Sequence, residues 1–473
     1  MAATSQEASS FSSTSFDYLI IGGGTGGLTV AARLAENPKI TVGVLEAGPY
    51  LPDMTTIKVP GYCWQNVGNP DVDWMFKSVP QKNLHGRQLA LTRGKILGGT
   101  SALNFTLMSR AAASEYDALE SLGNDGWNWN EILRYSRKSE TLASIPSEDA
   151  QKYNITPEEG SYGTNGPIAR SFPVAYSELD LPFLETLEEL GVKTVSDPQT
   201  GNIVGSWMAS FSIDRKTVSR SYAITGYYQP NMHRPNFHVL TSAHVTKILT
   251  RRDADGVVAT GVQFKHNNVI YAASAKQEVI LSAGAFQTPQ ILELSGIGNP
   301  SILKEHGLET VIDLPGVGEN LHPAVAKHHT ELYFNEQKGL FTSPFSAVAI
   351  LPLQGFSSHS ATEKIAQSVK GLNADSPVEK LFKQWIDDPN HGQMELALSL
   401  RLRPNVGVHL DDADMLVEAV KFIRKLTLTL PLEQFHQEFV EPGPKIQTDK
   451  ETTRNGLSNL DLLASFGYSE YAP

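Results

Sequence analysis

Short apolar runs that end in glycine alternate with apolar positions at helical spacing in the first part of the chain. Residues 16–21 are apolar and β-prone and lead into Gly22, as a buried strand entering a tight turn does. Apolar residues then recur at helical spacing over 26–37. A second apolar run follows at 40–45, with Glu46 at its end. This order of strand, helix and strand predicts a βαβ unit.

Strand patterns return later in the chain, at 237–240, 245–249, 259–264 and 278–281. Residues 253–256, with the sequence Asp-Ala-Asp-Gly, have the composition of a hairpin turn between the second and third of these runs. The last run leads into Gly284, just as the first run of the chain leads into a glycine. We therefore expect this run to join the sheet of the βαβ unit.

Helical spacing appears in two further places. Over 116–142 it suits helices packed on a sheet, and it is interrupted by a Gly-Asn-Asp-Gly break at 123–126. An isolated helix is predicted over 413–428. Residues 51–89 are rich in Pro, Gly, Asn and aromatic residues, a composition that favours a lid or a connecting excursion over a core element.

The turn after the first predicted strand carries the pattern G-x-G-x-x-G at Gly22, Gly24 and Gly27. Gly22 permits the tight turn, Gly24 lets the backbone approach a pyrophosphate, and Gly27 lets the helix pack closely on the strand. The pyrophosphate would lie at the N–H groups and positive dipole end of the helix. The Glu46 carboxylate would accept hydrogen bonds from a ribose and disfavour NADP. The pattern predicts a dinucleotide site without separating FAD from NAD.

Composition and charge exclude several classes of partner. Thirty-nine Lys and Arg against 51 Asp and Glu give a formal charge of -12, which repels the phosphates of nucleic acids. Cys63 is the only cysteine, so no internal disulfide or cysteine metal cluster can form, and we expect a small buried apolar residue there. No window reaches the ~20 apolar residues that span a bilayer, and residues 1–15 lack the features of a signal peptide. We expect a cytoplasmic protein without nucleic-acid or membrane partners, and the sequence does not predict its oligomeric state.

Two long stretches resemble the signatures of the glucose-methanol-choline (GMC) oxidoreductases, which use FAD. Residues 94–104, Gly-Lys-Ile-Leu-Gly-Gly-Thr-Ser-Ala-Leu-Asn, resemble the first signature, and residues 284–298 resemble the second. Shorter stretches follow in the family's order at Asp73-Trp74, 78–81, 126–129 and 315–321. The resemblance covers roughly residues 16–322, and more loosely 411–444. An NAD-dependent dehydrogenase would need both long matches to be coincidence, so FAD is the expected cofactor.

The resemblance implies roles for individual residues. Four residues would contact the diphosphate and ribose of FAD: Thr25, Gly26, Glu46 and Ala47. Seven would run along the isoalloxazine ring and its ribityl chain: Gly98, Gly99, Thr100, Asn104, Phe105, Thr106 and Leu107. Val245 resembles the family's adenine-side backbone contact. The residue types suit these roles, because glycines let the main chain lie against a flat ring and Asn104 offers both a donor and an acceptor.

The sequence therefore predicts an α/β fold in which a Rossmann-like FAD-binding domain is interwoven with an α+β substrate domain. Its antiparallel sheet is expected to be incomplete. A chain of 473 residues exceeds the ~250–300 at which a single core stops growing. The expected division is a disordered leader at 1–15, FAD-binding parts at 16–142 (with the lid 51–89) and 236–324, substrate parts at 143–235 and 325–447 (shortened), and a divergent tail at 448–473.

The expected catalytic segment of the family has no counterpart here. In GMC enzymes a histidine near the C-terminus removes the hydroxyl proton of an alcohol, and none of the thirteen histidines stands in its usual context. His322 precedes a proline but lies where the family has a flavin-side loop. His328 and His329 are adjacent, so on a strand they would point to opposite faces, and His436 is expected at the surface. We therefore name no catalytic base.

Two functions remain open at this point. The first is an FAD-dependent oxidoreductase of specialised metabolism, which oxidises a small-molecule alcohol to a carbonyl by hydride transfer to flavin N5. The second is a truncated, catalytically impaired or non-redox, cyclase-like homologue. The sequence does not distinguish an oxidase from a dehydrogenase, and it does not identify the substrate.

Overall fold

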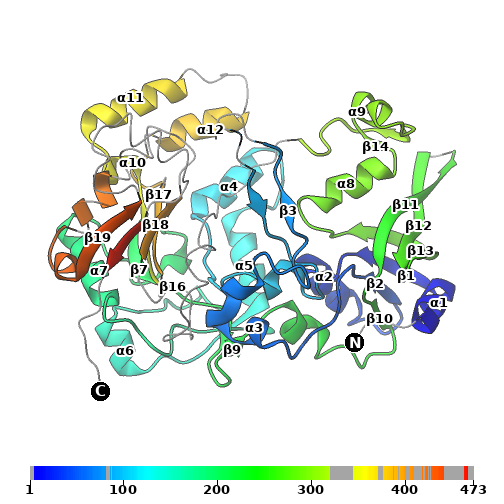
Figure 1. Ribbon diagram of the computed structural model, residues 1–473, viewed down its shortest axis with the longest axis horizontal. Helices are drawn as coiled ribbons and strands as arrows, with labels where there is room; N and C mark the ends of the chain where they lie inside the picture. The colour runs from blue at the N-terminus through cyan, green and yellow to red at the C-terminus, as the bar shows by residue number, and fades with distance from the viewer. Residues whose placement is uncertain are drawn as a thin grey trace.

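The chain forms two six-stranded sheets with helices packed on and between them (Figure 1). The computed structural model describes residues 5–80, 86, 88–254, 256–319, 345–370, 377–386, 388–392, 394–399, 405–409, 418, 421–423, 425–426, 428–441 and 463–466. In Figure 1 the first sheet lies on the right and the second on the left, with α4 (Ala113–Ser121) and α5 (Trp129–Ser139) between them. The break between these two helices confirms the one predicted at 123–126.

The first sheet contains the predicted βαβ unit. Its strands are β1 (Ser15–Ile21), β2 (Val42–Leu45), β10 (Phe237–Leu240), β11 (His244–Asp253), β12 (Gly256–His266) and β13 (Val269–Leu281). They are arranged in the order β10-β2-β1-β13-β12-β11. β1 pairs in parallel with both β2 and β13, while β11, β12 and β13 pair antiparallel. Asp253 lies opposite Gly256, which confirms the predicted hairpin turn.

Both faces of the first sheet are covered, which explains the continuous apolar runs of its central strands. Ile20 on β1 packs with the helix α2 (Thr25–Leu34) on one face. The neighbouring Leu19 and Ile21 point to the other face, as alternate strand residues do, and pack there near α8 (Gln287–Leu294). All four positions of β2 are buried.

The N-terminal residues differ from the prediction. Where the sequence predicted a disordered leader over 1–15, the structure has a helix, α1 (Ser5–Ser13). Ala8 and Phe11 of this helix are buried, and the Phe11 ring lies 4.5 Å from that of Phe16 and 6.2 Å from that of Phe264. Contacts with the sheet stabilise this Ser-rich segment as a helix, and the composition of the segment alone does not predict these contacts.

The second sheet is antiparallel, as expected for the substrate domain. Its strands are β7 (Gly205–Met208), β16 (Phe345–Leu351), β17 (Met394–Ser399), β18 (Asn405–His409), β19 (His436–Glu441) and β20 (Leu463–Phe466), in the order β19-β20-β18-β17-β16-β7. β20 lies within the segment 448–473, which the sequence predicted to be a divergent tail, and it pairs with both β18 and β19. Helix α7 (Asp180–Glu189) packs against this sheet.

The remaining elements connect the two sheets and cover them. The helices are α3 (Thr55–Lys58), α6 (Ser147–Lys152), α9 (Pro300–Glu305), α10 (Leu353–Phe356), α11 (His359–Lys370), α12 (Pro377–Ile386) and the short helices η1 (Pro60–Asn66), η3 (Gly99–Ala102), η4 (Pro198–Thr200), η5 (Ile224–Tyr228) and η7 (Leu432–Phe435). The strands are β3 (Phe76–Lys77), β4 (Ala90–Leu91), β5 (Glu140–Leu142), β6 (Ile168–Arg170), β8 (Ile213–Asp214), β9 (Ser219–Arg220), β14 (Ile297–Gly298) and β15 (Ile312–Asp313). No helix in the described ranges combines the length and the hydropathy that crossing a bilayer requires.

The structure describes most of the segment 51–89 and part of the helix predicted over 413–428. The excursion at 51–89 is not only a loop, because Ile57 and Val72 are fully buried in the core next to α2. Cys63 is fully buried, which agrees with the prediction of a buried residue. The helix predicted over 413–428 lies mostly outside the described residues. Its described members at 418, 421–423 and 425–426 are helical.

Candidate functional site

The turn from β1 into α2 can be built only with glycine at two positions. Gly22 has a φ of +99°, and a Cβ there would lie 2.5 Å from the Ser282 carbonyl oxygen. A Cβ at Gly27 would lie 1.9 Å from the Gly22 carbonyl oxygen, so the helix can approach the strand only without a side chain. A Cβ at Gly24 would meet only Gly99, at an ordinary 3.7 Å. The chain itself therefore tolerates a side chain at Gly24, and this backbone faces open space.

The first turn of α2 presents its amide groups to that space. The helix follows Gly24, which provides no side-chain cap. Within the helix the first backbone bond runs from the Leu28 N–H to the Gly24 carbonyl at 3.0 Å. The amides that precede Leu28 in the first turn have no carbonyl partner inside the helix. Such a group of N–H donors at a helix N-terminus is suited to binding a phosphate.

Glu46, at the end of β2, holds this turn together. Its Oε2 accepts the N–H of Gly23 at 2.8 Å, and its Oε1 accepts the N–H of Gly48 at 2.7 Å. Burial raises the pKa of Glu46 to about 7, against the opposing effects of these backbone donors and of Lys95. Each carboxylate oxygen has a second lone pair, so the group can still accept from a ligand.

A second glycine turn, from the predicted signature at 94–104, interlocks with the first. The Gly98 N–H donates to the Gly23 carbonyl at 2.7 Å, and Gly98 has a φ of +93°. A Cβ at Gly99 would lie 2.7 Å from the Gly24 Cα. The two turns touch through backbone alone, so each fixes the position of the other.

These turns form one side of a pocket of about 340 Å³, within the usual range for ligand sites. It lies at the carboxyl ends of β1, β2 and β13 and at the start of β11. Nine of the residues predicted to bind the cofactor line it: Gly22, Gly24, Thr25, Gly26, Glu46, Ala47, Gly99, Thr100 and Val245. The sequence therefore identified residues from four separate segments that the fold brings together.

The other predicted residues lie outside the lining of this pocket. Gly27 is beneath the turn, and Gly98 faces Tyr222 and Ile224. The segment from Asn104 to Leu107 continues towards the second sheet: the Phe105 ring stacks on Trp64 at 3.8 Å, Thr106 is fully buried with a φ of +64°, and Leu107 pairs with Phe211.

The expected chemistry of Asn104 requires a correction. The sequence suggested that its amide offers a donor and an acceptor to the ligand. In the structure the carbonyl oxygen, Oδ1, accepts from Arg220 Nη1 at 2.7 Å and from the Thr106 N–H at 3.3 Å. Both lone pairs of this oxygen are therefore used, and only the NH₂ group remains for a ligand.

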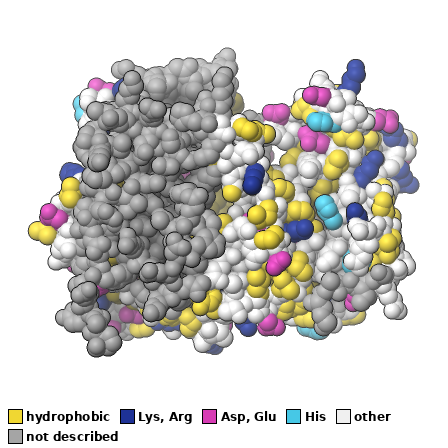
Figure 2. All heavy atoms as spheres, in the orientation of Figure 1, with side chains coloured by type: hydrophobic (Ala, Val, Ile, Leu, Met, Phe, Trp, Pro, Cys, Tyr) yellow, Lys and Arg dark blue, Asp and Glu magenta, His cyan; other side chains and the backbone are white. Residues whose placement is uncertain are grey.

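Sequence reasoning missed an aromatic and basic rim on the same pocket. Trp74, Phe76, Arg93, His244 and Phe286 line it. The Trp74 ring stacks on Phe76 with 5.7 Å between centroids and lies 5.5 Å from His244. The Arg93 guanidinium lies 4.7 Å from the centroid of Phe286. On the face drawn in Figure 2, Lys, Arg and His side chains are interspersed with hydrophobic ones over the half that the first sheet occupies.

Two signals could have revealed this rim. Trp74 belongs to the Asp73-Trp74 pair in the stretches that resemble the family, and Arg93 directly precedes the first signature. Asp73 fixes the rim, because its carboxylate accepts hydrogen bonds from the backbone N–H groups of Met75 and Arg93 at 3.0 and 3.1 Å.

Burial, aided by the positive charges of Lys95 and Lys265, lowers the pKa of His244.

Comparison with known proteins places this site in a family. A family model described as GMC oxidoreductase matches residues 16–326. A protein of Monascus purpureus named dehydrogenase mpl7 is 36% identical, over 79% of this chain and 64% of its own length. The GMC oxidoreductase family protein Mala s 12 of Malassezia sympodialis is 38% identical, over 66% of this chain and 52% of its own length. The chain thus spans about half to two thirds of the length of these relatives.

The fold is also found in a solved structure, that of an FAD-dependent oxidoreductase from Chaetomium thermophilum. It superposes with a TM-score of 0.80 at 26% identity, covering 95% of this chain and 88% of that one. FAD is accordingly the cofactor of this protein. The interlocked glycine turns, the family model that matches most of the chain and the identity to both relatives lead to one conclusion: the chain belongs to the GMC oxidoreductase family.

Proposed function

We propose that the pocket between the two glycine turns holds FAD, and that the protein oxidises a small-molecule alcohol to a carbonyl by passing its hydride to flavin N5. The observation that carries the proposal is the interlocking of the two turns beside an open pocket, where a helix N-terminus and the Glu46 carboxylate face the same space. Bound FAD supplies the hydride acceptor, and the chain supplies binding and orientation.

The residues around the pocket fit the parts of FAD. The amides of the first turn of α2, with Thr25 and Gly26, would hold the diphosphate, and Arg93 on the rim adds positive charge. Glu46 would accept from the ribose hydroxyls, and Val245 would lie at the adenine. The rings of Trp74 and His244, whose centroids lie 5.5 Å apart, offer flat surfaces of the kind that bases stack on.

The flavin ring would extend from Gly99 and Thr100 towards the second sheet, along Asn104 to Leu107. Leu107 packs there with buried apolar residues of β7 and β16 and the segments beside them, including Trp207, Ala209 and Val348. A substrate oxidised at the ring would therefore meet an apolar face of the second sheet. The word dehydrogenase in the names of the relatives supports the removal of hydride, and a role in specialised metabolism is part of the same proposal.

The alternative is a catalytically impaired or non-redox homologue. It is kept because His244, the only histidine on the pocket lining within the described ranges, lies next to Val245 at the proposed adenine end and not at the flavin ring. No other described residue of the pocket provides a nitrogen base for the alcohol proton. The two candidates differ in whether an alcohol reduces the bound flavin.

A spectroscopic experiment tests the proposal. The purified protein, titrated with FAD, is expected to show the visible absorbance of bound flavin, whereas NAD is expected not to compete. Primary and benzylic alcohols are then added without oxygen. Bleaching of the flavin supports alcohol oxidation, and a flavin that stays yellow with all of them supports the non-redox alternative. Failure of FAD to bind contradicts the proposed oxidation.

A second test uses the pH dependence of FAD binding. Ribose hydroxyls that donate to Glu46 favour its ionised form, so binding should lower the pKa of about 7 that this group has in the free protein. Below that pKa, binding must first release a proton. The affinity for FAD is therefore expected to be about tenfold higher at about pH 8 than at about pH 6. Quenching of FAD fluorescence across this range measures it.

The variant Glu46→Gln is the control for this pH dependence. It is expected to bind FAD more weakly and with an affinity that does not change with pH, because the group no longer titrates. Protonation of His244 would change the affinity for FAD in the opposite direction. A positive imidazolium would attract the diphosphate, so the affinity would be higher at low pH. An affinity of the unmodified protein that is flat or that falls with rising pH contradicts the assignment of Glu46.

A further inference from the structure

The segment from Asn104 to Met108, which would run along the flavin, is held at both ends by buried arginines. Arg170 from β6 donates to the Met108 carbonyl, and Arg220 from β9 donates to the Asn104 side chain at 2.7 Å. Arg170 and Arg220 have the two largest side chains among the fully buried described residues. Two buried cations on five residues next to a cofactor site require an explanation, because an ionised group is costly to bury.

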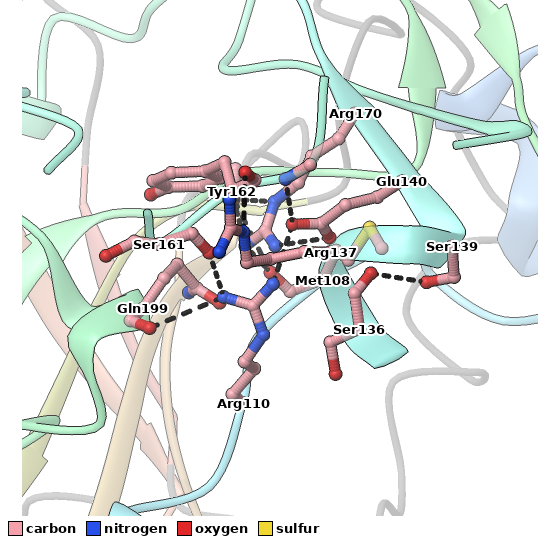
Figure 3. Close-up of polar contacts among 12 residues, drawn as sticks. Met108, Arg110, Ser136, Arg137, Ser139, Glu140, Ser161, Tyr162, Arg170 and Gln199 are labelled. Carbon is pink, nitrogen blue, oxygen red and sulfur yellow. Dashed lines mark hydrogen bonds and ion pairs between the residues drawn. The ribbon is translucent and has the colours of Figure 1, made fainter. Parts of the chain in front are cut away.

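The charge of Arg170 is balanced. Glu140 lies between Arg170 and Arg110 and bonds to both, with Oε2 2.8 Å from Arg170 Nη1 and Oε1 2.7 Å from Arg110 Nη2 (Figure 3). Arg170 Nε donates to Ser210 Oγ at 2.9 Å as well. This end of the segment therefore has an ion-pair network of its own, and its carboxylate compensates part of the buried positive charge.

The charge of Arg220 is not balanced in this way. Its Nε donates to the Ile57 carbonyl at 2.9 Å, and its Nη1 donates to the Ser101 carbonyl at 3.2 Å and to Asn104. Its Nη2 is buried without a hydrogen-bond partner, and Arg220 forms no ion pair with a carboxylate in the described part of the chain. Burial lowers the pKa of Arg220 to about 10, while Cys63 and Tyr222 oppose this effect. The guanidinium therefore remains protonated at neutral pH.

Arg220 also determines which way the Asn104 amide points. A guanidinium has five donors and no acceptor, so the Asn104 atom 2.7 Å from it must be the carbonyl oxygen. The NH₂ group is then directed away from Arg220 and can only donate. An oxidised flavin ring carries acceptor atoms that can receive a hydrogen bond from this NH₂ group. A carbonyl oxygen directed at the same atoms could form no hydrogen bond with them.

We propose that Arg220 is a positioning residue that fixes the Asn104 amide as a hydrogen-bond donor to the flavin and places an uncompensated positive charge behind it. The inference rests on the proposed function, because it needs the flavin ring at Asn104. A reduced flavin carries more negative charge than an oxidised one, so a cation near the ring favours the reduced form. Arg220 therefore raises the reduction potential of the bound flavin.

The experiment measures flavin affinity and reduction potential in three variants. Arg220→Gln removes the charge, Arg220→Lys keeps it, and Asn104→Asp places a carboxylate against Arg220 that neutralises it and cannot donate. Arg251→Gln is the control, because this arginine lies on β11 and its side chain is 68% exposed. Each holoenzyme is titrated anaerobically against a reference dye.

Arg220→Gln is expected to lower the preference for reduced over oxidised flavin about tenfold, equivalent to about 30 mV for a two-electron couple. Asn104→Asp should lower this preference at least as much. Arg220→Lys should retain most of the preference of the unmodified protein, and Arg251→Gln should leave it unchanged. If Arg220→Gln does not fold, the comparison of Asn104→Asp with Arg220→Lys still decides. Unchanged potentials in holoenzymes that bind flavin normally overturn this inference alone. An unmodified protein that binds no flavin overturns the proposed function, and the inference falls with it.

Discussion

Gly27→Ala is expected to yield a protein that is strongly destabilised and colourless. The added Cβ would lie 1.9 Å from the Gly22 carbonyl oxygen and 3.3 Å from Ile20 Cγ2. The carbonyl belongs to the backbone of the turn, so it can move only if α2 separates from β1. We expect the free energy of unfolding to fall by about 3 kcal/mol or more, at the upper end for overpacked positions, and the bound flavin to be lost. Thermal unfolding and visible absorbance of the purified variant measure both effects.

Gly26→Ala provides a matched control in the same turn of α2. No atom lies within 4 Å of a Cβ built at Gly26. Alanine is the better helix former by about 1 kcal/mol, so the free protein should be at least as stable as the unmodified one. Gly26 lines the pocket, so a loss of FAD affinity without a loss of stability would place it against the ligand. Equal melting temperatures for the two variants would contradict the role assigned to Gly27.

The second large effect is expected from Glu140→Gln. Glu140 bonds to both Arg110 and Arg170, whose side chains are 5% and 1% exposed. Its replacement leaves two like charges buried side by side without a carboxylate. Removing one partner of a buried ion pair typically costs about 3–5 kcal/mol, and here one carboxylate serves two cations. The free energy of unfolding in urea, followed by tryptophan fluorescence, measures the loss.

Glu36→Gln is the control for this measurement. Glu36 pairs with Arg33 at 2.7 Å on the surface, where the two side chains are 52% and 37% exposed. Exposed pairs contribute at most about 1 kcal/mol, so this variant should unfold almost as the unmodified protein does. Similar small losses in both variants would mean that the buried network does not stabilise the fold. Substitution of Arg170 as well should then recover none of the stability.

Sequence reasoning succeeded where a requirement is local. Gly27 is required by its contact with the Gly22 carbonyl oxygen in the same turn, and Gly22 by its own φ of +99°, although the atom that a side chain there would meet belongs to the distant Ser282. Glu46 follows at the end of the next strand, so its place at the same turn could be inferred from strand order. The hairpin at 253–256 is also decided by adjacent residues. Their contacts with FAD, like the domain boundaries, remain predictions.

Sequence reasoning failed where a contact joins distant segments. Asn104 and Arg220 are 116 positions apart, and no pattern near either one indicates that the amide oxygen is already occupied. The helix α1 was missed for a related reason, because Phe11 gains its stability from Phe264, far along the chain. The rim formed by Trp74 and Phe286 likewise exists only after folding. In each case tertiary packing overrides what the local composition suggests.

The position of β1 in the middle of the first sheet bears on how the protein is made. β1 leaves the ribosome well before one of its two partners, β13, which ends at Leu281. Until then, one edge of β1 and the base of its glycine turn, which rests on Ser282, stay uncovered. During synthesis the nascent chain therefore carries an apolar strand with one unpaired edge until β13 has emerged, and capture of the cofactor should follow, not precede, the arrival of residue 282.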